Sequence, residues 1–430
     1  MNGDFRVPQV QNAEQPWEVL DHGLTGIFSA VCQLLNETAS LTRMRNLLAV
    51  HAQQFEDDVR RLRDMRNDFR TRLELHMLPA PENPVERPAE PEEQPRAEIA
   101  RGITILELAD TNWEVESEDP AFNKDSVKLR YALSIDSVLC TFAFNKAGNL
   151  FAFADGKTAF TINSADGALI GACEIPPRGN AREPDTRAIV FSPDGKLLAL
   201  SGQSNSVVII DVASQRVIKT LDGHTHPVSS LAFLSNSQTL LSGAFDGRLC
   251  VWDMQTMELK KMIQHGKESQ KPDEVIVSLS VASDDEYVAV GFMNGTVGIY
   301  EPTFSQPMSV FAAHDEYLLS ISVGTNGLIA TTSGDKTAKI WMLKNMASCK
   351  HTLVGHEDFV LRCTFAPSDP LVFTGSKDET IKCWNYNTGA NLFTLTGHKN
   401  TVFQVDHHPT AKTIVSCSGE GLVCVWDYSF

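Results

Sequence analysis

A segment that begins with Gly397-His398 and ends with Trp426-Asp427 recurs along this chain, and this repetition limits the possible folds more than any other feature. Copies run from Gly355 to Asn385 and from Gly223 to Asp253, and a less regular copy runs from Ala313 to Met342. Each copy contains short apolar runs that are bounded by turn residues and are too short for helices. Such runs predict β-strands.

Repeats of roughly 40–45 residues with Gly-His at one end and Trp-Asp at the other are typical of WD-repeat β-propeller blades. When the chain is aligned on the Trp position, seven sites appear, with gaps of 48, 42, 48, 41, 43 and 42 residues. We therefore expect an all-β, seven-bladed propeller. Blades one, two and four lack the Trp and the acidic residue, so apolar packing must hold them. The seven aligned positions are Ile162, Ile210, Trp252, Tyr300, Trp341, Trp384 and Trp426.

An acidic turn residue precedes each of the four Trp residues by six positions and follows a His by 21 or 22 positions. In WD-repeat propellers, which the chain resembles, the His, a Ser or Thr, the acid and the Trp form a hydrogen-bonded network within a blade. The same residue types also form catalytic triads. We favour the structural role, because the set recurs in every regular copy and because a buried Trp N–H needs a partner. The four sets are His224, Ser242, Asp246 and Trp252; His314, Thr331, Asp335 and Trp341; His356, Thr374, Asp378 and Trp384; and His398, Ser416, Glu420 and Trp426.

Composition excludes several classes of function. The formal charge of −17 argues against direct binding to DNA, which requires a basic surface. No apolar run approaches the length of a membrane span, and the first residues do not resemble a signal peptide, so we expect a soluble intracellular protein. The nine cysteines include no Cys-x-x-Cys motif and are expected to be reduced thiols. The adjacent pair His407-His408 has no neighbouring ligand set, so we expect no metal and no cofactor. No P-loop or nucleophile elbow is present, so we do not expect an enzyme.

The N-terminal part has a different pattern. We expect residues 1–15 to be disordered and residues 16–78 to form a helical coiled coil, because apolar residues recur at every seventh position. The alternative is a helix that packs on the propeller. We favour self-association, because a propeller is already a closed core. The predicted oligomerisation seam consists of Leu20, Ile27, Leu34, Leu41, Leu48, Phe55, Leu62 and Phe69.

Residues 79–102 form a Pro- and Glu-rich linker, and the propeller is expected to occupy residues 103–430. Residues 79–126 hold thirteen Asp and Glu against four Lys and Arg, a net charge of −9. This acidic stretch is either a solubilising spacer or an arm that binds a basic partner such as a histone tail.

The strand expected at residues 127–133 has the place in the repeat of an outer strand. The seventh repeat ends at Asp427, three residues before Phe430, and lacks an outer strand of its own. We therefore predict that strand 127–133 pairs with the last blade and closes the ring.

The runs Cys140–Phe144 and Thr186–Gly195, together with Gly355–Leu361, Gly375–Asp378 and Gly397–Val402, resemble the Tup-type transcriptional corepressors. The order of helix, linker and seven blades is also that of this family, although the Gln-rich tracts common in its linkers are missing here. The resemblance implies a nuclear general corepressor that forms a homotetramer through its N-terminal helix. It implies a tetratricopeptide-repeat subunit and DNA-bound repressors as partners, together with histone tails and histone deacetylases.

In propellers, residues just after each His and just before each acidic turn residue lie in loops and face partners on the narrow face. Most of these positions are apolar here, and two are basic. This pattern predicts a docking site for short peptides with apolar anchors and acidic residues. The predicted narrow-face residues are Cys140, Arg187, Phe245, Met293, Tyr317, Leu319, Phe359, Leu361, Lys377 and Phe403.

The alternative function is a WD-repeat scaffold of another intracellular complex, either a ubiquitin-ligase substrate receptor or an RNA-processing subunit. Co-purifying proteins distinguish the two hypotheses. A tetratricopeptide-repeat protein and a deacetylase favour the corepressor, whereas a cullin or spliceosomal proteins favour the alternative.

Overall fold

A computed structural model describes residues 103–106, 113–176, 186–202, 205–264, 275–304, 307–343 and 348–430. The predicted coiled coil at 16–78, its seam residues and most of the linker at 79–102 lie outside these ranges. Among the described residues, no helix is long and apolar enough to cross a membrane.

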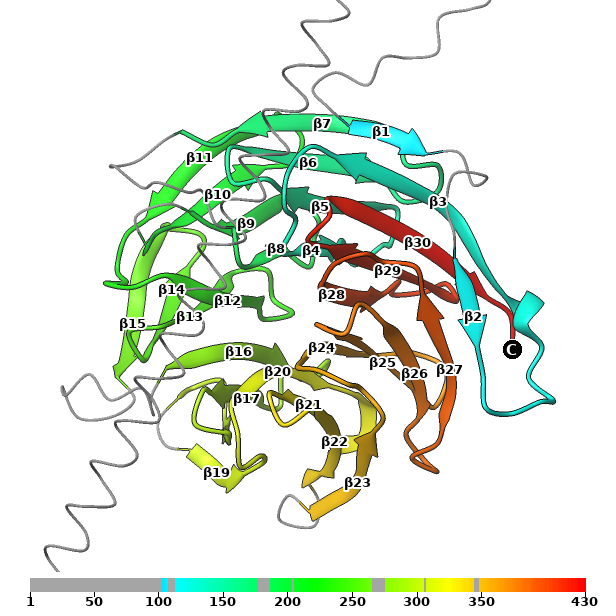
Figure 1. The fold of residues 1–430 in the computed structure, drawn as a ribbon. Coiled ribbons are helices and arrows are strands. Elements are labelled where there is room, and N and C mark those ends of the chain that lie inside the picture. The colour runs from blue at the N-terminus through cyan, green and yellow to red at the C-terminus, as the bar shows by residue number, and fades with distance from the viewer. Residues whose placement is uncertain are drawn as a thin grey trace, which may run out of the picture. The chain divides into compact units, whose positions relative to one another are not determined.

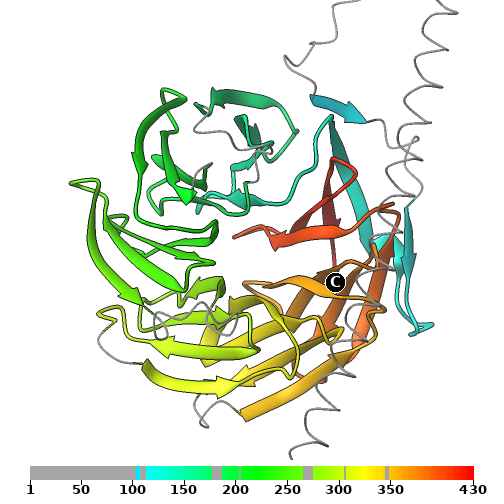
Figure 2. The same ribbon diagram turned by 60° about the vertical axis from the view of Figure 1, so that its left-hand side comes forward.

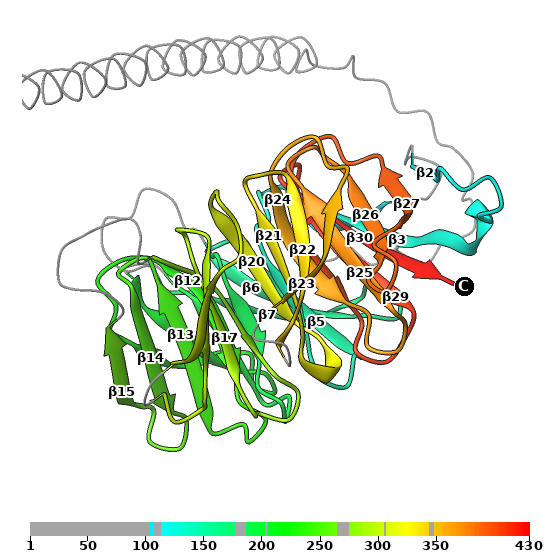
Figure 3. The ribbon, with the colours of Figure 1, turned by 90° about the horizontal axis from the view of Figure 1, so that it is seen from below.

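The strands of the described residues form seven antiparallel sheets, arranged as the blades of a ring (Figure 1). The predicted seven-bladed propeller is therefore confirmed. Figure 3 shows the sheets from the side, standing next to one another. Blade 1 contains β4 (Phe142–Phe144), β5 (Leu150–Ala154), β6 (Thr158–Asn163) and β7 (Leu169–Glu174), and blade 2 contains β8 (Ile189–Phe191), β9 (Leu197–Ser201), β10 (Val207–Asp211) and β11 (Arg216–Leu221). Blade 3 contains β12 (Val228–Phe233), β13 (Thr239–Ala244), β14 (Arg248–Asp253) and β15 (Glu258–Gln264), and blade 4 contains β16 (Ile276–Val281), β17 (Val288–Phe292), β18 (Thr296–Tyr300) and β19 (Pro307–Ala312). Blade 5 contains β20 (Leu318–Val323), β21 (Leu328–Ser333), β22 (Thr337–Met342) and β23 (Ser348–Val354).

The last two blades each have a fifth strand. Blade 6 consists of β24 (Val360–Phe365), β25 (Leu371–Ser376), β26 (Ile381–Asn385) and β27 (Asn391–Thr396), with β2 (Glu114–Glu116) added to its outer edge. Blade 7 consists of β28 (Val402–His407), β29 (Thr413–Ser418) and β30 (Leu422–Tyr428), followed by β3 (Val127–Ile135) and β1 (Ile103–Leu106). The cyan strands of this N-terminal part lie beside the red and orange strands of the last blades (Figure 2).

The predicted ring closure is present. Strand β3 pairs with β30 from Val127 opposite Tyr428 to Ser134 opposite Leu422, and it extends two residues beyond the predicted 127–133. Arg130 strengthens the junction through a bidentate ion pair with Asp427, with nitrogen–oxygen distances of 2.8 and 2.5 Å. The N–H of Ile135 also donates to the carbonyl of Gly421. Gly421 has a φ of +79°, and a side chain there would collide with the Ile135 carbonyl.

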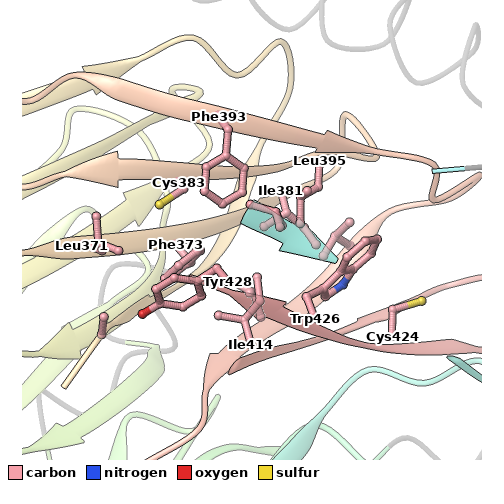
Figure 4. Packing of buried hydrophobic residues seen from close by; sticks show 14 of the residues in the cluster. Leu371, Phe373, Ile381, Cys383, Phe393, Leu395, Ile414, Cys424, Trp426 and Tyr428 are labelled. Atoms are coloured by element: carbon pink, nitrogen blue, oxygen red, sulfur yellow. The ribbon is translucent and has the colours of Figure 1, made fainter. Parts of the chain in front are cut away.

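The hydrophobic core is divided among the junctions between blades. Each of seven clusters of buried side chains joins two consecutive blades, and one of them joins blade 7 to blade 1. Because both faces of a blade are covered, its middle strands are apolar on both sides, as in Leu249-Cys250-Val251-Trp252 of β14. Figure 4 shows the junction of blades 6 and 7, where Phe373 and Ile381 face Ile414 and Trp426.

Candidate functional site

The predicted blade network forms in blades 3, 5, 6 and 7. In blade 6, His356 Nδ1 lies 2.8 Å from Asp378, His356 Nε2 lies 2.7 Å from the Thr374 hydroxyl, and Trp384 Nε1 lies 2.8 Å from the same hydroxyl. The other three sets make the same contacts at 2.7–3.3 Å. Because the indole N–H donates to the hydroxyl oxygen, we infer that the hydroxyl donates to Nε2 and that Nδ1–H donates to the carboxylate.

The environment of the network explains the protonation of its members. Burial lowers the pKa of His356 and outweighs the opposing effect of Asp378, so the ring is neutral. The same balance lowers the pKa of His314. Burial disfavours the charged form of Asp246, but hydrogen bonds from His224 and from two backbone N–H groups prevail and lower its pKa to about 2.

The geometry favours the structural interpretation of these residues over a catalytic one. The four hydroxyl residues Ser242, Thr331, Thr374 and Ser416 are 0% exposed, so a substrate has no access to them. Each hydroxyl oxygen also accepts the N–H of a buried Trp. The network therefore satisfies the polar groups of a buried tryptophan and histidine.

The predicted narrow-face residues lie at one end of the blades, which we call the turn face. There the turn between the second and third strands meets the loop before the first strand. A backbone hydrogen bond of 2.8–3.0 Å joins the two segments in blades 3 to 7, for example from Lys377 N–H to the Phe359 carbonyl. None of the ten residues is buried: Arg187, Tyr317, Phe359 and Lys377 are exposed, and Cys140, Phe245, Met293, Leu319, Leu361 and Phe403 are half-buried.

One part of the sequence interpretation is wrong. Leu319, Leu361 and Phe403 were expected in loops, but they lie in the innermost strands β20, β24 and β28. Each occupies a β-bulge, where the strand register shifts and one residue is left without a paired partner. The same register position holds Ser229 in blade 3 and Val277 in blade 4. Sequence reasoning missed these two residues because a bulge has no clear signature in an apolar strand.

Tyr317 and Phe359 form the most exposed apolar part of the turn face, at 57% and 39% exposure. They belong to neighbouring blades that meet at Gly334, where the Phe359 ring packs nearby and the Gly334 N–H donates to the Tyr317 carbonyl at 2.9 Å. The ammonium group of Lys377 lies 5.2 Å from the centre of the Phe359 ring and 3.3 Å from Asp358. On another part of the turn face, the Arg187 guanidinium lies 5.6 Å from the Phe245 ring. Both basic side chains are thus held beside aromatic rings.

The adjacent histidines make structural contacts. His407 Nε2 lies 2.8 Å from the Tyr428 hydroxyl, and His408 Nε2 lies 2.8 Å from the Gly148 carbonyl of blade 1. Burial lowers the pKa of His407 to about 4. In the described ranges, no three His, Cys, Asp or Glu side chains gather as metal ligands would.

Seven antiparallel blades, four of which contain this His–hydroxyl–Trp network, define a WD-repeat β-propeller scaffold. Residues 137–427 match the family described as the IFT122 first beta-propeller, and the chain belongs to this family.

The chain is also similar to proteins with diverse names. It is 28% identical over 221 residues to the nuclear distribution protein nudF of Emericella nidulans, a match that covers 46% of this chain and 48% of nudF. It is 27% identical over 248 residues to the apoptotic protease-activating factor 1 of Rattus norvegicus, covering 55% of this chain and 19% of that protein. It is 26% identical over 231 residues to the transcription factor unc-37 of Caenorhabditis elegans, covering 53% and 36%. The chain thus spans less than two thirds of each of these relatives.

Proposed function

We propose that this protein is a non-enzymatic, nuclear transcriptional corepressor. In this proposal the turn face binds short segments of DNA-bound repressors. The N-terminal segment 16–78 assembles a homotetramer and binds a tetratricopeptide-repeat subunit, and the assembly brings histone deacetylases to histone tails. Similarity to the transcription factor unc-37 supports a role in transcription.

The exposed pair Tyr317 and Phe359 is the observation that carries this proposal. Exposure of large aromatic side chains to water is unfavourable, and such side chains supply much of the binding energy in protein interfaces. The neighbouring Lys377, together with Arg187 elsewhere on the face, places basic groups beside aromatic rings. An apolar peptide that carries acidic residues is the complementary partner.

The second candidate is a scaffold of another complex, such as a ubiquitin-ligase substrate receptor or an RNA-processing subunit. The diversity of the relatives supports this second candidate, because the names of nudF and of the apoptotic factor do not refer to transcription. Both candidates use the propeller for protein binding, and they differ in the partners that it binds.

The test is affinity purification of the full chain from its own cells, read by mass spectrometry, with wild type, Phe359→Ala and Arg187→Glu compared. Wild type should capture a tetratricopeptide-repeat protein and DNA-binding repressors. Phe359→Ala should weaken repressor binding roughly thirtyfold, the equivalent of about 2 kcal/mol. Arg187→Glu should weaken it by charge repulsion. Both variants should still capture the tetratricopeptide-repeat protein.

Val310→Ala is the matched control, because Val310 is an exposed apolar residue on the outer strand β19 and is not one of the turn-face residues. All variants should melt like wild type, since none of the three side chains is buried. Unchanged repressor capture by both turn-face variants, or capture of a cullin or of spliceosomal proteins, would contradict the corepressor proposal.

A further inference from the structure

The centre of the ring contains a cavity of about 280 Å³, lined by the innermost strands of all seven blades. This volume far exceeds the roughly 10–15 Å³ that one water molecule needs. The cavity therefore has room for a small solute. It is distinct from the exposed aromatic pair, because neither Tyr317 nor Phe359 lines it.

Most polar groups of the cavity wall already hold the blades together. The Ser230 hydroxyl accepts the Leu279 N–H of the next blade, and the Ser278 hydroxyl accepts the Ile321 N–H. Gln404 bonds to the Thr141 hydroxyl at 2.9 Å and to the Phe142 carbonyl at 2.6 Å. Each of the two serines keeps a hydroxyl proton that can be donated into the cavity.

Arg362 is the exception on this wall. It lies in the innermost strand of blade 6, next to the bulge at Leu361, and the same register position holds the uncharged residues Ser320 in blade 5 and Gln404 in blade 7. Within the described part of the chain, its guanidinium has neither an ion pair nor a side-chain hydrogen bond. An arginine keeps its charge even where burial lowers its pKa, as it does here. Arg362 is half-buried and lines the cavity, so its charge is accessible to an anionic group of a ligand bound there.

Asp406 of blade 7 lines the same cavity and acts electrostatically on Arg362, although the two groups are too far apart for an ion pair. Its Oδ1 accepts hydrogen bonds from the Thr364 hydroxyl and the His407 N–H, both at 2.9 Å. In the described residues, Oδ2 has no such donor. Burial raises the Asp406 pKa, while these hydrogen bonds and Arg362 oppose the rise.

We infer that the central cavity binds a small zwitterion of the α-amino acid type, with its carboxylate on Arg362 and its ammonium group on Asp406. A simple anion would satisfy Arg362 but would face the Asp406 carboxylate in the same small space. A simple cation would meet the reverse problem. A ligand that carries both charges can pair with both groups, and the hydroxyls of Ser230 and Ser278 can donate hydrogen bonds into the same cavity.

The inference is tested on the full chain by isothermal titration calorimetry and by thermal shift. Glycine and serine serve as zwitterions, acetate as an anion, and methylammonium as a cation. The zwitterions should bind saturably and raise the melting temperature. Acetate and methylammonium should bind at least about tenfold more weakly, since each loses a charged hydrogen bond.

Arg362→Gln and Asp406→Asn should each lower the affinity for glycine at least about tenfold. Arg216→Gln, which removes an exposed arginine of β11, is the matched control and should bind like wild type. Asp406→Asn keeps an acceptor oxygen for Thr364 and His407, so it should fold even if Arg362→Gln does not. In Asp406→Asn, glycine and acetate should bind with equal affinity.

Three results would overturn the inference. They are acetate binding to wild type as tightly as glycine, a lack of saturable binding of either zwitterion at millimolar concentrations, and an unchanged preference for glycine over acetate in Asp406→Asn. None of these results bears on whether the turn face binds repressors, so the two proposals can fail separately.

Discussion

Blades 1 and 2 and blades 6 and 7 have the same strand order but are stabilised by different groups. In blade 6, Trp384 pairs in the ladder with Val372, and Thr374 two residues later bonds to its indole. In blade 1, Ile162 pairs with Phe151, and the corresponding later residue is Phe153. In blade 1, therefore, the side chain at the Trp position has no N–H to donate, and the residue at the Thr position has no hydroxyl to accept it.

The same substitution occurs in the other irregular blades. Blade 2 has Ile210 and Leu200 at these positions, and blade 4 has Tyr300 and Val290. The indole N–H and the hydroxyl that accepts it are present together or absent together, because either group left alone in the core would cost about 1–3 kcal/mol. A blade can therefore be held by apolar packing alone, provided that the whole network is replaced.

Blades 6 and 7 are also reinforced from outside. The ring of Trp113 packs edge-on against both His398 and Trp426, with ring centres 4.7 and 4.6 Å apart. Phe122 stacks on Phe393 at 5.4 Å, and the Ser117 hydroxyl donates to the Leu392 carbonyl. The segment before β3 thus covers the outer edges of blade 6 and of blade 7, the blade in which the ring closes.

The largest expected effect comes from removing this reinforcement. A chain that begins at residue 136 lacks β3 and should lose cooperative melting. Four large buried side chains of β3, Val127, Tyr131, Leu133 and Ile135, contribute about 1.5–3 kcal/mol each, comparable to the whole stability of a typical domain. A chain that begins at residue 119 lacks β1 and β2 and should melt earlier but cooperatively, and one that begins at residue 101 should melt like the full chain.

Calorimetry of the three truncated chains measures this series. Equal melting temperatures for the chains that begin at residues 101 and 136 would show that blade 7 does not depend on β3.

A smaller effect is expected when the network of one blade is broken. Thr374→Val leaves the Trp384 N–H and the His356 Nε2 without their partner, at about 1–3 kcal/mol for each buried group. Thr374→Ser keeps the hydroxyl and should cost only about 0.8 kcal/mol for the lost methyl group.

Thr161→Val in blade 1 is the matched control, because its buried hydroxyl makes one long contact, 3.4 Å from Gln215. Urea unfolding should rank Thr374→Val as clearly the least stable of the three variants. A loss for Thr161→Val as large as that for Thr374→Val would remove the distinction between the two kinds of blade.

The smallest effect is a graded response to acid. The pKa of His314 and of His356 is lower in the folded chain than the ordinary value of 6.5, so protonation favours unfolding. Their contribution to stability is complete above pH 6.5 and is lost as the pH falls toward the folded pKa. The carboxyl pKa values of Asp246, Asp335 and Glu420 are also lowered, so a second loss begins near their ordinary values of 3.8 and 4.5.

Hydrogen exchange followed by mass spectrometry locates this response. After correction for intrinsic rates, a change from pH 7 to pH 5 should deprotect blades 5 and 6 more than blades 1 and 2. A uniform change over all blades would contradict the assignment to these histidines.

The sequence was sufficient for the seven blades, the four networks and the closing strand, because each leaves a short motif or a missing strand in a regular repeat. It was insufficient for the bulges at Leu319, Leu361 and Phe403, since a bulge depends on pairing between strands. Arg362 was also overlooked, although a charge inside the strand from Val360 to Phe365 was visible in the sequence. Only the closed ring shows that its neighbours are Asp406 and a row of serines.

The pairing of β3 with β30 also has a consequence for folding kinetics. Arg130 and Asp427 are 297 positions apart, so Arg130 leaves the ribosome long before Asp427 is synthesised. Contacts between such distant positions form slowly, because a long loop must close before they contribute. Blade 7 is therefore the last blade that can be completed, and until then the edges of β3 and β30 are open to other chains.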